Sequence, residues 1–120
     1  MAEALPIVLD VDTGIDDALA VLLAVRSPEV QLMACGTVAG NVDAHTAAEN
    51  TLRVLEAVGA ADVPVAVGCD RPLVGPPRDA RAVHGHDGLG NARLPAPGRR
   101  PSAEHAVDQL LRVTRERPGE

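Results

Sequence analysis

Apolar and polar positions alternate in blocks along the first half of the chain. A short apolar run at 5–9 is followed by a polar turn and then by a longer apolar run at 18–25. The first run has the length and β-branched content of a buried strand, and the second is long enough for a helix that is buried on most sides. Apolar runs at 30–38 and 63–68 predict two further strands.

A helix is expected between the second and third of these strands. Asp43 or Thr46 can cap its first turn, and Thr46 with Glu49 fits a capping box. Gly59 is expected to end it. The expected core-facing positions recur at three- and four-residue spacing: Ala47, Ala48, Thr51, Leu52, Leu55 and Val58. Strands that alternate with helices through short turns predict an α/β fold with a Rossmann-like parallel or mixed sheet and flanking helices.

The segment 69–101 has a different character, because it holds most of the prolines and shows no periodicity. We expect a long, lid-like loop there. His84 and His86 are its notable residues, and three interpretations stay open: a transition-metal pair, a lid that carries a histidine to a substrate, or a solvated loop.

A last helix is expected at 102–115, capped by Ser102, with His105 on its surface. Its expected apolar side consists of Ala106, Val107, Leu110, Leu111 and Val113.

Four carboxylates surround the junction between the first strand and the first helix. Asp10 and Asp12 lie at alternate positions at the end of the strand, so they are expected on one face. Gly14 suits a tight turn, and Asp16 and Asp17 then fall in the first helical turn, where the helix dipole favours anions.

Carboxylates in close contact repel one another and raise each other's pKa, and a cation relieves this repulsion. Since the cluster offers oxygen atoms and neither His nor Cys, a hard divalent ion such as Ca²⁺ or Mg²⁺ is the expected partner. The alternative is a capped helix with a solvated acidic turn.

Composition narrows the range of partners. With 120 residues and 46% hydrophobic content the chain forms at most one domain, and the absence of aromatic residues excludes a base-stacking platform. The net charge of −6, with no basic stretch beyond Arg99-Arg100, argues against nucleic-acid binding. Cys35 and Cys69 are expected to be buried free thiols. An acidic N-terminus and the lack of a membrane-length apolar run lead us to expect a cytoplasmic protein without membrane partners.

The segment Leu9-Asp-Val-Asp-Thr-Gly-Ile-Asp-Asp-Ala18 resembles the N-terminal motif of the inosine/uridine-preferring nucleoside hydrolases. The resemblance continues through Gly36-Thr-Val-Ala-Gly-Asn41, Val63-Pro-Val-Ala-Val-Gly-Cys-Asp-Arg-Pro-Leu73 and His84-Gly-His-Asp-Gly-Leu-Gly90, and it covers essentially the whole chain in order. Thr13 stands where many members have Pro.

This resemblance implies hydrolysis of the N-glycosidic bond of ribonucleosides to ribose and free base, with a tightly held Ca²⁺ and a calcium-activated water as nucleophile. By residue match, Asp12 and Asp17 would be metal ligands, with Asp12 also the general base. Asp16 and Asn41 would bind the ribose hydroxyls.

Two further residues follow from the same match. His84 would lie on the loop that closes over the substrate, and Asp10 would support the cluster from behind. If Asp12 and Asp17 share an ion, their carboxylates should lie within about 5–6 Å of each other.

Family members are more than twice as long, so we expect residues 1–120 to be the N-terminal part of a single nucleoside hydrolase domain. Within it we expect strand–helix repeats at 5–68, the loop at 69–101 and the helix at 102–115. The complete enzyme is expected to form homo-oligomers, and the fragment alone is expected to be nearly inactive.

Two other functions remain open at this point. Haloacid-dehalogenase-like phosphohydrolases also begin with strand-Asp-x-Asp, but Gly14 and the pair Asp16-Asp17 do not fit that motif. The other alternative is a non-catalytic, metal-binding fragment.

Overall fold

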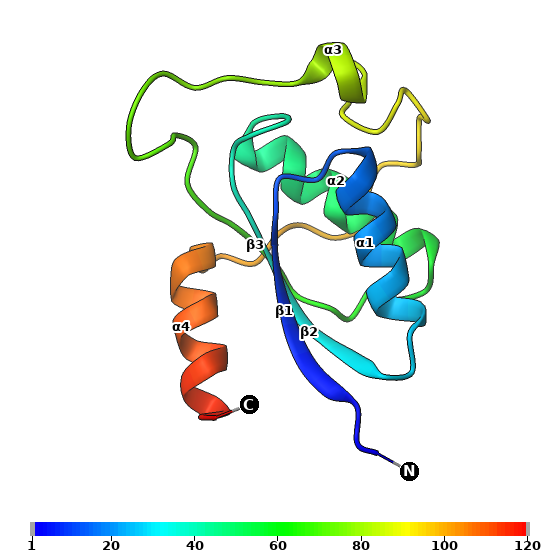
Figure 1. Ribbon diagram of the computed structural model, residues 1–120. Coiled ribbons are helices and arrows are strands. Elements are labelled where there is room, and N and C mark those ends of the chain that lie inside the picture. Colours follow the sequence, from blue (N-terminus) through cyan, green and yellow to red (C-terminus); the bar gives the residue numbers. More distant parts are fainter. Residues whose placement is uncertain (1, 120) are drawn as a thin grey trace.

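Three parallel strands form the centre of the protein (Figure 1). The structure is a computed structural model that describes residues 2–119. The strands are β1 (Leu5–Val11), β2 (Val30–Thr37) and β3 (Val65–Val67), in the spatial order β1-β2-β3. All strand pairs are parallel, which confirms the α/β prediction.

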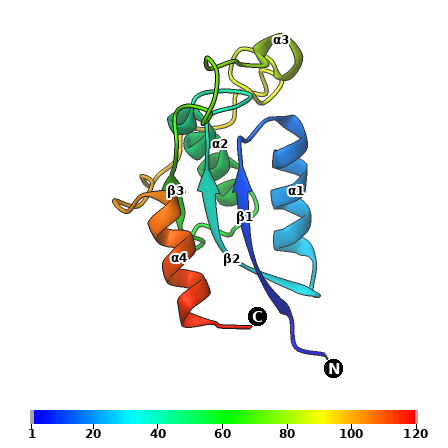
Figure 2. The ribbon, with the colours of Figure 1, turned by 60° about the vertical axis from the view of Figure 1, so that its left-hand side comes forward.

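Helices cover both faces of the sheet. Helices α1 (Ile15–Arg26) and α2 (Ala44–Ala57) contact each other and β2, whereas α4 (Ala106–Glu116) contacts β2 and β3 from the opposite face (Figure 2). The hydrophobic core lies between the sheet and the α1–α2 pair. Side chains alternate between the two faces of each strand, so alternate strand residues point into this core. Its buried members include Val21, Cys35, Leu52, Leu55 and Val65.

Helix α1 begins at Ile15, three residues before the expected apolar run, and ends at Arg26. Asp16 and Asp17 lie in its first turn, as predicted. The prediction that this helix is buried on most sides is wrong, since Leu19 is 62% and Leu23 is 71% exposed. Within the described residues, α1 packs against the sheet and α2 on one side only, so its outward-facing leucines contact solvent.

Helix α2 follows its predicted pattern closely. Asp43 is the N-cap, because its carboxylate accepts hydrogen bonds from the backbone N–H of Thr46 (2.8 Å) and from the Thr46 hydroxyl (2.7 Å). Thr46 is therefore the donor rather than the cap. Gly59, at φ +77°, follows the helix as expected. The predicted core positions Ala47, Ala48, Thr51, Leu52 and Leu55 are buried.

The segment after β3 has two parts. Residues 69–79 are exposed throughout, whereas the part that follows contains a short helix, α3 (Arg81–His84), and then places Leu89 in the hydrophobic core. Cys35 is a buried free thiol as expected, but the prediction for Cys69 is wrong. Cys69 is exposed because β3 ends at Val67 and the chain then leaves the sheet.

The last helix begins later than predicted. Its N-cap is His105, whose Nδ1 accepts a hydrogen bond from the backbone N–H of Val107 at 3.2 Å. Ser102 is not the cap; its backbone N–H donates to the carbonyl of Val65 at 2.8 Å, so the chain is still hydrogen-bonded to β3 at that point. Much of the predicted apolar side of α4 is exposed, because the helix covers only part of the sheet: Val107, Leu110 and Leu111.

None of the helices within residues 2–119 combines the length and the apolarity that crossing a bilayer requires.

Candidate active site at the carboxyl ends of the strands

The turn after β1 holds Asp12 between two neighbouring segments. The backbone N–H of Asp12 donates to Oδ2 of Asp17 at 3.2 Å, which joins the end of the strand to the first turn of α1. The Asp12 carboxylate in turn accepts a hydrogen bond from the backbone N–H of Asn41 at 2.8 Å. Asp12 is thereby fixed at the carboxyl ends of β1 and β2, the edge at which α/β proteins bind ligands.

A glycine makes the second of these contacts possible. A Cβ atom placed on Gly40 would lie 2.8 Å from Cγ of Asp12 and would overlap its Oδ2. Real Cβ atoms do not approach other heavy atoms so closely. The loop between β2 and α2 can therefore lie directly against the Asp12 carboxylate only because residue 40 has no side chain.

The carboxyl group of Asp17 has a pKa raised from its ordinary 3.8 to about 6. Partial burial is the largest cause, followed by hydrogen bonding and charge repulsion from Asp12, and by the charge of Asp16. The two carboxylates therefore lie close enough for the negative charge of Asp12 to disfavour ionisation of Asp17. A cation between them would offset the charge repulsion that contributes to this shift.

The chemistry of this pair fits a hard cation, since both side chains offer only oxygen. The pair is not a complete metal site by itself. Within residues 2–119 no group of three or more His, Cys, Asp or Glu side chains is arranged to hold a metal ion. Asp12 and Asp17 can thus contribute two ligands, and any further ligands would have to be other groups.

His84 reaches the same edge of the sheet from the end of α3. Its Nδ1 accepts a hydrogen bond from the backbone N–H of Ile15 at 3.0 Å, and the same nitrogen lies 3.9 Å from Oδ1 of Asp16. A nitrogen that accepts a hydrogen bond carries no proton, so His84 is neutral in this arrangement and the contact with Asp16 is not an ion pair. His84 caps the N-terminus of α1, where Asp16 is exposed.

Gly14 lies beneath this histidine. A Cβ atom at residue 14 would lie 2.7 Å from Nδ2 of Asn41 and 2.8 Å from Cε1 of His84. The two polar side chains therefore converge over Gly14, one from the loop after β2 and the other from α3. The structure thus brings together five of the six predicted site residues: Asp12, Asp16, Asp17, Asn41 and His84.

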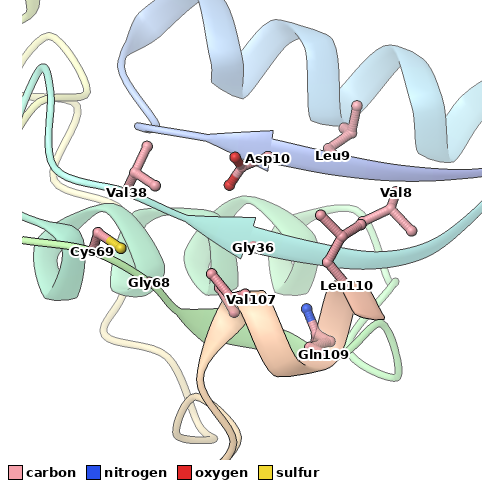
Figure 3. Close-up of a pocket in the computed structure, with 11 residues that line it drawn as sticks. Val8, Leu9, Asp10, Gly36, Val38, Gly68, Cys69, Val107, Gln109 and Leu110 are labelled. Atoms are coloured by element: carbon pink, nitrogen blue, oxygen red, sulfur yellow. The ribbon is translucent and has the colours of Figure 1, made fainter. Parts of the chain in front are cut away.

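Asp10 lies in a different environment. Figure 3 shows it pointing from β1 into a cavity bounded by α4, where Val107, Gln109 and Leu110 form the opposite wall. Its carboxylate lies over Gly36 of β2, 3.3 Å from where a Cβ of that residue would be. The role predicted for Asp10, support of the cluster from behind, stays a prediction.

The alternative interpretation of His84 and His86 as a metal pair finds no third ligand among the described residues. His86 is exposed, and its backbone carbonyl accepts a hydrogen bond from Nε of Arg81 at 3.2 Å. His84 lies at the carboxyl edge of the sheet, where the lid interpretation would place it, and that interpretation stays a prediction.

Sequence reasoning missed a polar cluster inside the core beneath this site. Thr13, Asn50 and Thr51 are all buried, and the Thr13 and Thr51 hydroxyls lie 2.7 Å apart. Thr51 also donates to the carbonyl of Ala47 at 2.8 Å, so its single proton is used and Thr13 is the donor between them. Polar residues on the buried stripe of α2 were the available signal for this cluster.

The fold and the site define a parallel α/β protein with an acidic site at the carboxyl edge of its sheet and a histidine above it. Residues 7–120 match the family model described as "Inosine-uridine preferring nucleoside hydrolase". The chain belongs to the inosine-uridine preferring nucleoside hydrolase family.

Known proteins agree with this assignment. Uridine nucleosidase 1 of Arabidopsis thaliana is 44% identical over 115 residues, which are 95% of this chain and 34% of that protein. The inosine-uridine preferring nucleoside hydrolase of Leishmania major is 41% identical over 106 residues, 88% of this chain and 34% of its own length. A solved plant nucleoside hydrolase superposes with a TM-score of 0.90 at 42% identity, over 96% of this chain and 37% of that one. The chain therefore spans about a third of the length of the relatives it matches.

Proposed function

We propose that this chain forms the calcium- and ribose-binding part of a ribonucleoside hydrolase, which cleaves the N-glycosidic bond to give ribose and the free base. The observation that carries the proposal is the paired placement of Asp12 and Asp17, with Asn41 and His84 converging over Gly14 beside them. Relatives named for inosine and uridine hydrolysis support the substrate class. Membership in this family also decides against the phosphohydrolase alternative.

In this proposal Asp12 and Asp17 hold Ca²⁺ through their carboxylate oxygens. The raised pKa of Asp17 supports this role, because a site that penalises two adjacent negative charges gains when a divalent cation binds. A bound Ca²⁺ would supply a Lewis acid that lowers the pKa of water. Asp12 would accept the proton of the attacking water, and the Asn41 backbone N–H would hold that carboxylate in place.

The remaining polar groups would bind the sugar. The Asp16 side chain is 79% exposed, so it is available to accept hydrogen bonds from ribose hydroxyls, and the Asn41 side chain lies over Gly14. As water adds to the anomeric carbon and the bond to the base nitrogen breaks, positive charge develops on the ribose ring. Nearby carboxylates stabilise that charge, as in other glycoside hydrolysis.

His84 would cover the substrate from the loop side. Its present hydrogen bond to Ile15 keeps it at the rim of the site, from which a small movement would bring it over a bound ribose. A cytoplasmic location and a homo-oligomeric longer enzyme are further expectations from the sequence.

Calcium binding by the 120-residue chain tests the metal part of this proposal. Isothermal titration with CaCl₂ should show one binding event that Asp12→Asn and Asp17→Asn each abolish and that Asp62→Asn, at an exposed position, leaves unchanged. Equal binding by all four proteins would contradict the assignment of the ligands.

Hydrolysis tests the catalytic part. Ribose release from inosine and uridine should be negligible for this chain alone and substantial for a chain extended to the length of its relatives. Asp12→Asn in the extended chain should then lose activity at unchanged folding. Comparable turnover by the short and extended chains would instead show that residues 1–120 suffice for catalysis.

A further inference from the structure

Asn50 lies in the middle of α2, and only 1% of its surface is exposed. A buried amide must be hydrogen-bonded, or its burial costs free energy. Its Nδ2 donates to the backbone carbonyl of Asp87 at 2.8 Å and to that of Thr13 at 3.4 Å. The two hydrogens of one amide therefore serve two carbonyls from segments far apart in the sequence, the turn that carries Asp12 and the loop that carries His84.

Hydrogen bonds within the loop connect Asp87, which accepts from Asn50, to His84. The Asp87 carboxylate accepts hydrogen bonds from the backbone N–H groups of Leu89 and Asn91, each at 2.8 Å, which fixes a tight turn. Leu89 then inserts into the hydrophobic core, and the N–H of Gly90 donates to the carbonyl of His84 at 2.6 Å. A displacement of Asp87 would therefore displace His84.

The position accepts few other side chains. Two donors on one short side chain are needed, a requirement that aspartate and threonine do not meet, since ionised aspartate donates nothing and threonine has a single proton. The loop approaches so closely that a Cβ on Gly88 would lie 3.0 Å from the Asn50 nitrogen and 2.9 Å from Cγ1 of Val42.

We propose that Asn50 is a positioning residue that holds His84 against the N-terminus of α1, by tying the His84 loop to the turn after β1. Its importance for catalysis rests on the proposed function, whereas the positioning itself does not. The hydrogen bonds of the Asn50 amide go to the backbone carbonyls of Asp87 and Thr13, so we assign it a positioning role and not direct contact with substrate or metal.

Nuclear magnetic resonance of the 120-residue chain tests the proposal without any activity measurement. In the unaltered chain at neutral pH, the imidazole nitrogen shifts of His84 should show a single tautomer with the proton on Nε2, because Nδ1 accepts from Ile15. Asn50→Ala should give averaged tautomers for His84 and about tenfold faster amide exchange at Ile15, since one net hydrogen bond is worth roughly that factor.

Gln109→Ala is the matched control. Like Asn50, Gln109 is 1% exposed and donates through its side-chain amide to a backbone carbonyl, that of Cys35 at 3.0 Å. Gln109 lies on α4, on the other face of the sheet. It should lower global stability without changing the His84 tautomer or the exchange of Ile15 relative to the core amides.

The outcomes separate cleanly. If Asn50→Ala leaves the His84 tautomer and Ile15 exchange unchanged, or if Gln109→Ala changes them equally, the proposal is overturned while the proposed nucleoside chemistry is untouched. If Asn50→Ala does not fold, the unaltered chain provides the test. Slow exchange of the Asn50 side-chain amide, with nuclear Overhauser contacts to Gly88, supports the link between the two segments, and the absence of both overturns it.

Discussion

The backbone N–H of Asp12 donates to Oδ2 of Asp17 at 3.2 Å. Asp12, at the end of β1, and Asp17, in the first turn of α1, therefore lie on the same side of the strand–helix junction. This proximity, together with partial burial, raises the pKa of Asp17 to about 6. The folded chain therefore binds a proton at Asp17 more tightly than the unfolded chain does.

The first prediction follows from that difference. Stability contributed by protonated Asp17 is present below about pH 4 and is lost as pH rises through about 6, where the folded protein must accept the charge. Without calcium, the free energy of unfolding in urea should fall across this interval, and Asp17→Asn should remove that part of the fall. Added Ca²⁺ should stabilise the unaltered chain more at pH 7 than at pH 5. Parallel pH profiles for the two proteins would contradict this origin of the raised pKa.

The second prediction concerns Gly40. Gly40→Ala places a methyl group inside the space of the Asp12 side chain, which must then move away from Asn41. Calcium affinity should fall by roughly 10–100-fold, as when other groups that orient metal ligands are lost. Gly98→Ala is the control, because its new methyl group would meet only Oε1 of Glu56, at an ordinary 3.7 Å. Equal affinities for the two variants, measured by titration calorimetry, would show that Asp12 does not depend on this approach.

The third prediction is an asymmetry between two buried threonines. Thr13→Val removes a donor and leaves the Thr51 hydroxyl still bonded to the carbonyl of Ala47, so it should cost about 0.5–1.5 kcal/mol. Thr51→Val leaves the Thr13 hydroxyl buried without an acceptor and should cost about 1–3 kcal/mol. The double variant should cost less than the sum of the two. Urea unfolding of the four proteins gives all three values, and a larger cost for Thr13→Val would reverse the assigned direction of the hydrogen bond.

The fourth prediction separates the two parts of the segment 69–101. Leu89→Ala removes a core side chain and should destabilise the chain by about 2–4 kcal/mol. Leu73→Ala alters a fully exposed side chain and should change stability by less than about 0.5 kcal/mol. Limited proteolysis offers a second check: the unaltered chain should be cut within 70–79, and Leu89→Ala should add cuts between 85 and 95.

Local patterns in the sequence were sufficient to predict most of the fold. Short apolar runs placed the strands, three- and four-residue spacing placed α2, and Asp43 was one of the two caps considered. The start of α4 could not be predicted in the same way, because Ser102 is a good capping residue by type. Its backbone pairs instead with Val65, a tertiary contact that no local pattern reveals.

The candidate site likewise has features that local sequence patterns predict and features that depend on tertiary contacts. Convergence of Asp12 and Asp17 follows from a strand, a turn and a helix start, all of which are local. The burial of α1 was overestimated because an apolar sequence does not say whether another element covers it. Asn50 was missed since its partners, Asp87 and Thr13, come from segments whose proximity only the folded chain defines.

The insertion of Leu89 into the core limits how far His84 can travel. Five peptide units separate the two residues, and a fully extended chain of that length reaches at most about 18 Å. A short stretch of chain therefore connects His84 to Leu89, which is fixed in the protein interior. On the other side of α3, residues 70–79 are exposed. Any outward movement of His84 is therefore limited by the length of the stretch from 85 to 88.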